Sequence, residues 1–159
     1  IDDALRERLG EGVVALPEVA GRGPITVGVV VVAEPPYAEG VGDSATLELP
    51  ADDIEAVAAA RRSVERLIVV ILSGRPVMLD EILPEADAVI AAWLPGTEGA
   101  GIVDVLVGDV PFTGTTPFAW PRTPEDSPRT GRSACEGAVF PAGFGLDTAG
   151  TALGPAACP

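Results

Sequence analysis

The sequence predicts an α/β fold in which an open, mostly parallel sheet carries helices on both faces. Three apolar runs, at 25–33, 66–74 and 87–96, lack the alternation of a half-exposed strand. Such continuous runs are typical of strands buried on both faces of a parallel sheet. Helical segments follow the runs, which is the order produced by right-handed crossovers. The chain has 159 residues, of which 47% are hydrophobic, so it is about one domain long and can bury a sizeable core.

The elements around these strands have local signals. Pro35 and Pro36 end the first strand because proline has no N–H for the ladder, so 34–45 is expected to be a loop. The remaining expected elements are a helix at 2–9 ended by Gly10, a short strand and turn at 12–21, an extended piece at 47–49, a short helix within 76–86, and a helix at 97–109 ended by Gly108.

The clearest helix signal is at 51–63 (ADDIEAVAAARRS), directly after Pro50. Asp52 and Asp53 lie in its first turn, where the helix dipole favours negative charge. Its apolar stripe is predicted to be Ile54, Val57 and Ala58.

The strand–helix pattern stops near Pro111, where Pro, Gly, Thr and Ser become frequent. Short extended pieces are expected at 116–120 (TPFAW) and near 139–145 (VFPAGFG). We therefore expect a lead-in helix and turn at 1–24, an α/β core at 25–110, and an ordered Pro/Gly-rich tail at 111–159 that packs on the same domain.

Composition excludes several kinds of chemistry. The formal net charge of −14 argues against nucleic acid or an anionic membrane as a partner, because both require basic patches. The sequence contains no Lys, His, Asn or Gln. A Ser-His-Asp triad, an imidazole metal ligand and a lysine Schiff base are therefore impossible. We expect no metal and no cofactor, and any chemistry must come from carboxylates, hydroxyls, Arg, Tyr37 or the cysteines.

Cys135 and Cys158 are the only cysteines, too few for a zinc site. They could form one disulfide that holds the C-terminal tail, or remain two unpaired thiols. A disulfide would indicate an oxidising compartment, extracellular or periplasmic, whereas free thiols would also suit the cytoplasm. No stretch reaches the ~18 apolar residues of a membrane span. The sequence begins without Met and we expect no signal peptide in it, so Ile1 is expected to be a processed or excised start.

Carboxylates gather just after the first strand, where ligands bind in open α/β sheets. Glu34, Glu39 and Asp43 all lie in the segment EPPYAEGVGD. Asp43 follows Gly42 and is expected to cap a turn, and Glu34 to accept a hydrogen bond from loop backbone. Glu39, between Ala38 and Gly40, is the most free to project outward, either as a functional group or as a solvated charge.

The next two strands end in similar loops. In AAWLPGTEG (91–99), Trp93 is expected in the core, Thr97 can cap the following helix, and Glu98 suits a helix N-terminus whatever its function. Arg75 of SGRP emerges on the same edge, and we expect it to form an ion pair that braces the loops.

Residues 40–45 (GVGDSA) match the dinucleotide fingerprint G-x-G-x-x-A after a strand. That fingerprint requires a helix to begin inside the motif, and here the segment that follows is extended and reaches Pro50 first. A nucleotide-binding α/β domain is therefore the weakest of three hypotheses.

Six segments together resemble the second domain of family 3 glycoside hydrolases, the β-glucosidases and β-glucan exohydrolases. They are AEPPYAEGVGD, LPADD, ILSGRPVML, ADAVIAAWLPGTEGAGIVDVLVGD, FTGTTPFAWPRT and FPAGFGL. The match runs in order from about residue 25 to 146, and is weak before and after. The sequence between Pro121 and Phe140 departs from the usual family pattern.

The resemblance implies a three-layer α/β/α sandwich that follows a TIM-like barrel. It implies a retaining, exo-acting β-glucosidase or β-glucan glucohydrolase that releases terminal β-D-glucosyl residues. The barrel, which is not in this chain, would supply the aspartate nucleophile in cis or in trans. Pro36-Tyr37-Ala38-Glu39 matches the family's Pro-Tyr-x-Glu segment, so Glu39 is expected to be the acid/base. Tyr37 and Asp43 are expected to contact the β-glucoside or β-glucan substrate.

A rival hypothesis is a stand-alone, non-catalytic α/β domain that binds a glycan or a protein. It predicts no hydrolysis, and folding without any partner.

Overall fold

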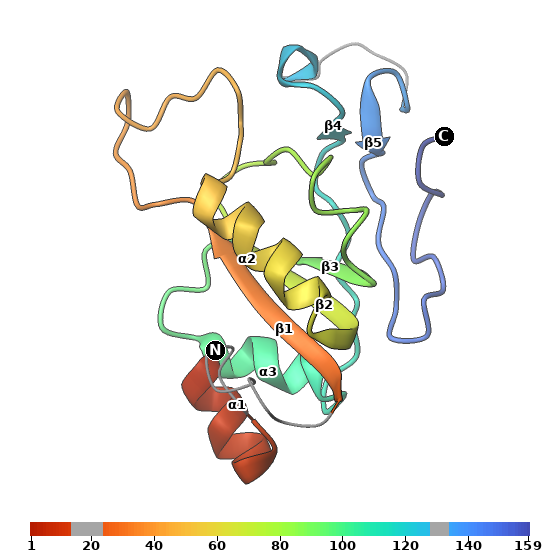
Figure 1. Ribbon diagram of the computed structural model, residues 1–159. Coiled ribbons are helices and arrows are strands. Elements are labelled where there is room, and N and C mark those ends of the chain that lie inside the picture. Colours follow the sequence, from red (N-terminus) through yellow and green to blue (C-terminus); the bar gives the residue numbers. More distant parts are fainter. Residues whose placement is uncertain (14–23, 128–133) are drawn as a thin grey trace. The chain divides into compact units, whose positions relative to one another are not determined.

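The computed structural model describes residues 1–13, 24–127 and 134–159. The elements in chain order are α1 (Asp2–Leu9), η1 (Gly10–Gly12), β1 (Ile25–Ala33), α2 (Ala51–Arg61), β2 (Val64–Leu72), β3 (Ala88–Ala91), α3 (Gly99–Leu106), β4 (Trp120–Pro121), η3 (Pro124–Asp126) and β5 (Ala138–Phe140), as Figure 1 shows.

The chain forms two compact units. The N-terminal unit comprises Ile1–Ser44 and Glu48–Val103, and the C-terminal unit comprises Ala45–Leu47 and Asp104–Pro159. The predicted segment boundaries, after residues 24 and 110, stay a prediction.

A parallel sheet forms the centre of the N-terminal unit. Its three strands lie in the order β1-β2-β3. The β1–β2 register runs from Ile25 opposite Val64 to Ala33 opposite Leu72, and β2 pairs with β3 from Ile68 opposite Ala88 onward. The predicted α/β class with a parallel sheet is therefore confirmed.

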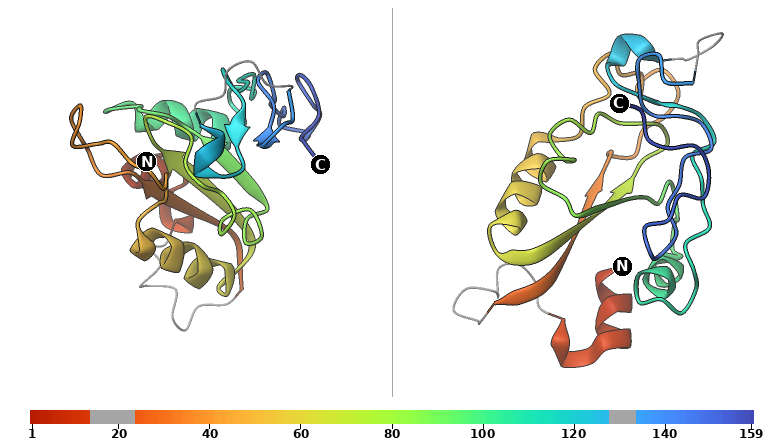
Figure 2. Two further views of the ribbon diagram at one scale, coloured as in Figure 1. Left: turned by 90° about the horizontal axis from the view of Figure 1, so that it is seen from above. Right: turned by 90° about the vertical axis from the view of Figure 1, so that its right-hand side faces the viewer.

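Helix α2 connects β1 to β2 and lies along one face of the sheet (Figure 2). It is the helix predicted at 51–63, ending two residues earlier at Arg61. Val57 and Ala60 are its buried residues, whereas Ile54 and Ala58 of the predicted stripe are half-buried. The core is densest along the central strand, where Leu67, Val69, Val70 and Ile71 are fully buried.

Strand β1 differs from the prediction in its burial. It matches the expected bounds, but Val27 and Val31 are 51% and 39% exposed. The reason is that β1 lies at the edge of the sheet, so its solvent-facing residues have fewer neighbours than those of β2. Strand β3 is also shorter than the predicted 87–96 and only half-buried.

The short helix expected within 76–86 does not form. Residues 80–85 instead form successive turns, with Leu83 N–H donating to Leu79 O (2.9 Å) and Ala86 N–H to Ile82 O (3.1 Å). Pro84 explains the difference, because its ring would clash with the preceding turn of a helix.

Three other expectations concern segments that are not part of the sheet. Helix α3 ends before Gly108, whose φ of 87° is readily accessible only to glycine. Leu47–Leu49 is not a strand, and Leu47 has a φ of 55°. Most of the strand and turn predicted at 12–21 lies outside the described residues.

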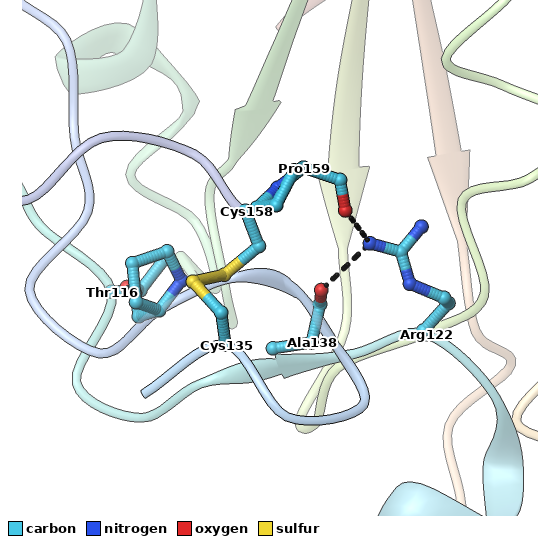
Figure 3. Close-up of a disulfide and its surroundings, with 7 residues drawn as sticks. Thr116, Arg122, Cys135, Ala138, Cys158 and Pro159 are labelled. Carbon is cyan, nitrogen blue, oxygen red and sulfur yellow. Dashed lines mark hydrogen bonds between the residues drawn. A yellow bond between two sulfur atoms is a disulfide. The ribbon is translucent and has the colours of Figure 1, made fainter. Parts of the chain in front are cut away.

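In the C-terminal unit, β4 and β5 pair antiparallel with Trp120 opposite Phe140. Short extended pieces were expected in both places. Cys135 and Cys158 form a disulfide, so of the two alternatives for these residues the bonded one is observed (Figure 3). Arg122 Nη2 donates to Ala138 O (3.0 Å) and Pro159 O (2.8 Å), and Cys158 N–H donates to Val139 O (3.1 Å). The last residues are therefore held to β5.

Candidate functional site

The loop 34–43 leaves the sheet at the carboxyl end of β1. Glu34 N–H donates to Leu72 O (3.0 Å), which extends the β1–β2 ladder by one bond. Ala33 N–H donates to the Asp53 carboxylate in the first turn of α2 (2.9 Å). Pro35 and Pro36 have no N–H to continue the ladder, so the chain turns away from the sheet here.

A tight turn forms the tip of this loop. Gly42 N–H donates to Ala38 O (2.8 Å), and Asp43 N–H donates to Gly40 O (3.2 Å). Gly40 has a φ of 80°, a left-handed conformation that glycine adopts without steric cost. The turn places Glu39 at the tip of the loop, six residues after the end of β1.

Arg75, three residues after β2, forms an ion pair with the first residue of the loop. Its Nε and Nη2 lie 2.8 and 2.6 Å from Glu34 Oε1. Its Nη1 donates to Gly42 O (2.6 Å). The Glu34 side chain is only 6% exposed, so this partner compensates a nearly buried charge. The predicted bracing role of Arg75 is confirmed.

Tyr37 lies inside the same cluster. Its hydroxyl donates to Glu34 Oε2 (3.3 Å), and the Arg75 guanidinium carbon lies 4.7 Å from the ring centroid. A Cβ placed on Gly42 would overlap the ring at Cδ2, so Gly42 packs directly against the tyrosine. Glu34, Tyr37, Gly42 and Arg75, called the loop brace below, thus connect the beginning, middle and end of the loop.

Glu39 and Asp43 stand outside the loop brace. Both are exposed, and neither carboxylate makes a hydrogen bond or ion pair with any residue in the described part of the chain. The expected capping by Asp43 is therefore not observed. Glu34 also differs from expectation, because its carboxylate bonds to Arg75 and Tyr37 and not to loop backbone. The structure brings Glu34 and Tyr37 together and leaves Glu39 and Asp43 exposed to solvent.

The neighbouring strand ends support this edge. Ser73 is buried; its N–H donates to Trp93 O (3.1 Å) and its Oγ to Arg75 O (2.7 Å). Trp93, expected in the core, is half-buried with a φ of 54°. Thr97 Oγ1 donates to the Glu98 carboxylate (3.1 Å).

Exposed apolar side chains also occur here. Val41 at the loop tip is 88% exposed and Leu94 after β3 is 75% exposed. Leu94 and the Tyr37 hydroxyl both border Gly74.

Sequence reasoning missed two contacts of the site. Asp53 was assigned only to the dipole of α2, but its carboxylate also holds the end of β1. The close packing of Gly42 on Tyr37 was also missed, although the paired glycines around Val41 were a signal for a tight approach. No helix begins within 40–45, and α2 begins only at Ala51, so the geometry required for a dinucleotide pyrophosphate is absent from this fully described segment.

Comparison with known proteins gives a consistent result. The model of the glycosyl hydrolase family 3 C-terminal domain matches residues 5–148. A periplasmic beta-glucosidase from Salmonella typhimurium is 29% identical over 143 residues, covering 74% of this chain and 19% of that protein. A xylan 1,4-beta-xylosidase from Xylanibacter ruminicola is 30% identical over 114 residues, covering 66% of this chain and 13% of that protein.

A solved structure shares the fold. The crystal structure of a beta-glucosidase from Listeria innocua superposes with a TM-score of 0.67 at 22% identity, covering 77% of this chain and 20% of that chain. The present chain therefore spans about a fifth or less of the length of these relatives.

Proposed function

Because the chain belongs to the glycosyl hydrolase family 3 C-terminal domain family, we propose that it is the second domain of a retaining, exo-acting β-glucosidase in which Glu39 is the acid/base. The observation that carries this proposal is the contrast within one loop. In the loop brace, the Glu34 carboxylate is paired with Arg75. The Glu39 carboxylate is exposed at the tip and unpaired among the described residues.

The chemistry requires a second carboxylate about 5–5.5 Å from the first. An aspartate on a barrel domain outside this chain would attack the anomeric carbon. As the glycosidic C–O bond breaks, Glu39 gives its proton to the departing oxygen. The Glu39 carboxylate then takes a proton from water while the water oxygen attacks the same carbon, which releases the sugar and restores the aspartate.

Glu39 needs a second domain for a further reason. A general acid must hold its proton until the leaving oxygen needs it, which requires a site shielded from water. Tyr37, Val41 and Leu94 offer exposed apolar surface around the loop. A barrel that covers these side chains would exclude water from Glu39.

The relatives support a β-glycoside as the substrate, and we propose a terminal β-D-glucosyl residue of a β-glucoside or β-glucan oligosaccharide. Tyr37 and Asp43 are the further residues of this chain that we propose to contact it. The Cys135–Cys158 disulfide supports an oxidising compartment, extracellular or periplasmic. Among the described residues, every helix is too short or too polar to cross a bilayer.

The test is Glu39→Ala in the complete enzyme that contains this chain. We expect turnover of glucosides with poor leaving groups to fall by roughly 10²–10⁴-fold, since general acid catalysis contributes that much. Activated aryl glucosides, whose leaving groups need no protonation, should lose far less. Glu55→Ala, which removes an exposed carboxylate from α2, is the matched control and should leave both rates unchanged.

If Glu39→Ala turned over each substrate type as fast as wild type does, the assignment of Glu39 as the acid/base would be contradicted. A complete protein that hydrolyses no β-glycoside, even with a barrel-bearing partner, would favour the non-catalytic binding domain.

A further inference from the structure

We propose that Arg75 is the positioning residue that fixes the direction and height of Glu39 above the sheet. The inference rests on the proposed function of Glu39 and goes beyond it by identifying what holds that carboxylate in place.

Arg75 contacts the loop on both sides of Glu39. Before it in sequence, Nε and Nη2 lie 2.8 and 2.6 Å from Glu34 Oε1, and the guanidinium carbon lies 4.7 Å from the centre of the Tyr37 ring. After it, Nη1 donates to Gly42 O (2.6 Å). One planar group therefore sets the separation between the two arms of the loop, and Glu39 lies on the turn that joins them.

Arg75 is itself fixed to the sheet. Its backbone carbonyl accepts a hydrogen bond from Ser73 Oγ (2.7 Å), and Ser73 is only 2% exposed. Ser73 follows β2 directly, and its N–H donates to Trp93 O (3.1 Å). The carboxyl edge of the sheet therefore holds Arg75 in place, and Arg75 in turn holds the loop. Without Arg75, the tip would keep the hydrogen bonds of its own turn and the packing of Gly42 on Tyr37, but would lose its hydrogen bond to the segment that follows β2.

An arginine is required for this arrangement. Its planar group offers donors from three nitrogens in a rigid fork and can stack on an aromatic ring. A lysine ammonium is a compact charge that can pair with Glu34, but it cannot also reach Gly42 O and cover the ring with the same geometry. Arg75→Lys therefore keeps the charge and loses the alignment.

The kinetic test uses Arg75→Lys in the complete enzyme, with substrates that have poor leaving groups. A displacement of the acid by about 1 Å can cost up to about 10²-fold, so we expect kcat to fall about 10- to 100-fold. KM should change less than kcat, because the displaced acid acts in the reaction step, whereas Arg75 affects substrate binding only through its contact with Tyr37. Arg62→Lys is the matched control: Arg62 is exposed and has no partner in the described part of the chain.

A second measurement observes the loop directly, without activity. In hydrogen exchange, the Gly42 and Asp43 amides, which bond within the turn, should exchange faster in Arg75→Lys than in wild type. Amides of β2 should keep their protection. Glu34→Gln weakens the loop brace by removing the charge that pairs with Arg75. It should lower kcat and speed loop exchange, as Arg75→Lys does. This variant provides the test if Arg75→Lys does not fold.

A double-mutant cycle separates this inference from the proposed function. If Arg75 acts through Glu39, Arg75→Lys should cause no further loss in a Glu39→Ala background. If the losses in kcat of the two single variants multiply in the double variant, the positioning role is overturned. It is also overturned if Arg75→Lys has normal kcat and normal loop exchange while Glu39→Ala is inactive. Full activity of Glu39→Ala would instead refute the proposed function, and with it the purpose assigned to Arg75.

Discussion

Two glutamates five positions apart in one loop occupy opposite environments. Glu34 makes the last hydrogen bond of the β1–β2 ladder, so its side chain lies beside Arg75 and is nearly buried. Glu39 lies beyond two prolines and on a glycine turn, so it reaches solvent. The sequence was sufficient to select Glu39 as the freer carboxylate, because Ala38 and Gly40 flank it. It was not sufficient to pair Arg75 with Glu34 specifically, because that choice depends on which strand ends are neighbours in the sheet.

The packing of Tyr37 on Gly42 gives a prediction at the same scale. Gly42→Ala would place a methyl group inside the tyrosine ring, so the ring or the turn must move. We expect a loss of about 1–3 kcal/mol in the free energy of unfolding, or of local loop opening, as for other overpacked sites. The resonances of this single tyrosine, measured by nuclear magnetic resonance, should shift.

Gly114→Ala provides the comparison for Gly42→Ala, since a Cβ there would meet no atom within 4 Å. It should leave the tyrosine resonances in place. Unchanged tyrosine resonances in Gly42→Ala as well would show that Gly42 does not pack against the Tyr37 ring in solution.

At the scale of the elements, the amino edge of the sheet is held by a charged cluster. Asp87, just before β3, accepts hydrogen bonds from Leu67 N–H (2.8 Å), Arg61 Nη1 (2.7 Å) and Arg66 Nη1 (3.2 Å). Arg61 Nη2 also donates to Val64 O (2.8 Å) and Glu65 O (2.7 Å). The end of α2 is thus tied to the beginnings of β2 and β3.

This cluster predicts a specific acid sensitivity. The Leu67 N–H, and after it the Arg61 side chain, lower the pKa of Asp87 from 3.8 to about 2. Because the folded pKa lies below the unfolded one, the stabilisation is complete above about pH 4 and is lost as the pH falls toward 2. In denaturant titrations between pH 5 and 2, Asp87→Asn should be less stable than wild type at pH 5, and the difference should shrink as the pH falls.

Asp80→Asn serves as the control, because Asp80 is exposed and its carboxylate has no partner among the described residues. It should leave the wild-type pH dependence intact. A constant gap between Asp87→Asn and wild type across the whole pH range would contradict the role of this carboxylate.

How well each element could be predicted depended on whether its signal was local. The bounds of β1 and α1 follow from the apolar run before Glu34 and from Gly10, and both agree with the structure. The helix expected within 76–86 was wrong, because Pro84 lies inside the segment and its ring disfavours a continuous helix. The exposure of Val27 and Val31 could not be predicted, since a Val-rich run does not reveal whether its strand is central or at an edge.

At the scale of the whole molecule, the C-terminal unit contains one covalent cross-link. The disulfide joins residues 23 positions apart, and Arg122 holds Pro159 O beside it. In the chain-entropy account, closing a loop of this size stabilises the folded state by about 3 kcal/mol. We therefore expect Cys135→Ser/Cys158→Ser to unfold at a lower temperature, and trypsin to cleave at Arg122 more readily.

Reductant should reproduce this effect in wild type and have none on the double variant. Equal proteolysis of Arg122 in oxidised and reduced wild type would show that hydrogen bonds alone hold this segment.

In the chain, α2 lies between two strands that pair directly with each other, and this order has a consequence for folding during synthesis. β1, α2 and β2 are consecutive in the chain, and β1 and β2 pair along their whole length, so this part can assemble once Leu72 has left the ribosome. Arg75 follows three residues later and completes the loop brace around Glu39. Cys158 comes far later, so we expect the disulfide of the C-terminal unit to form on a chain whose proposed catalytic loop is already in place.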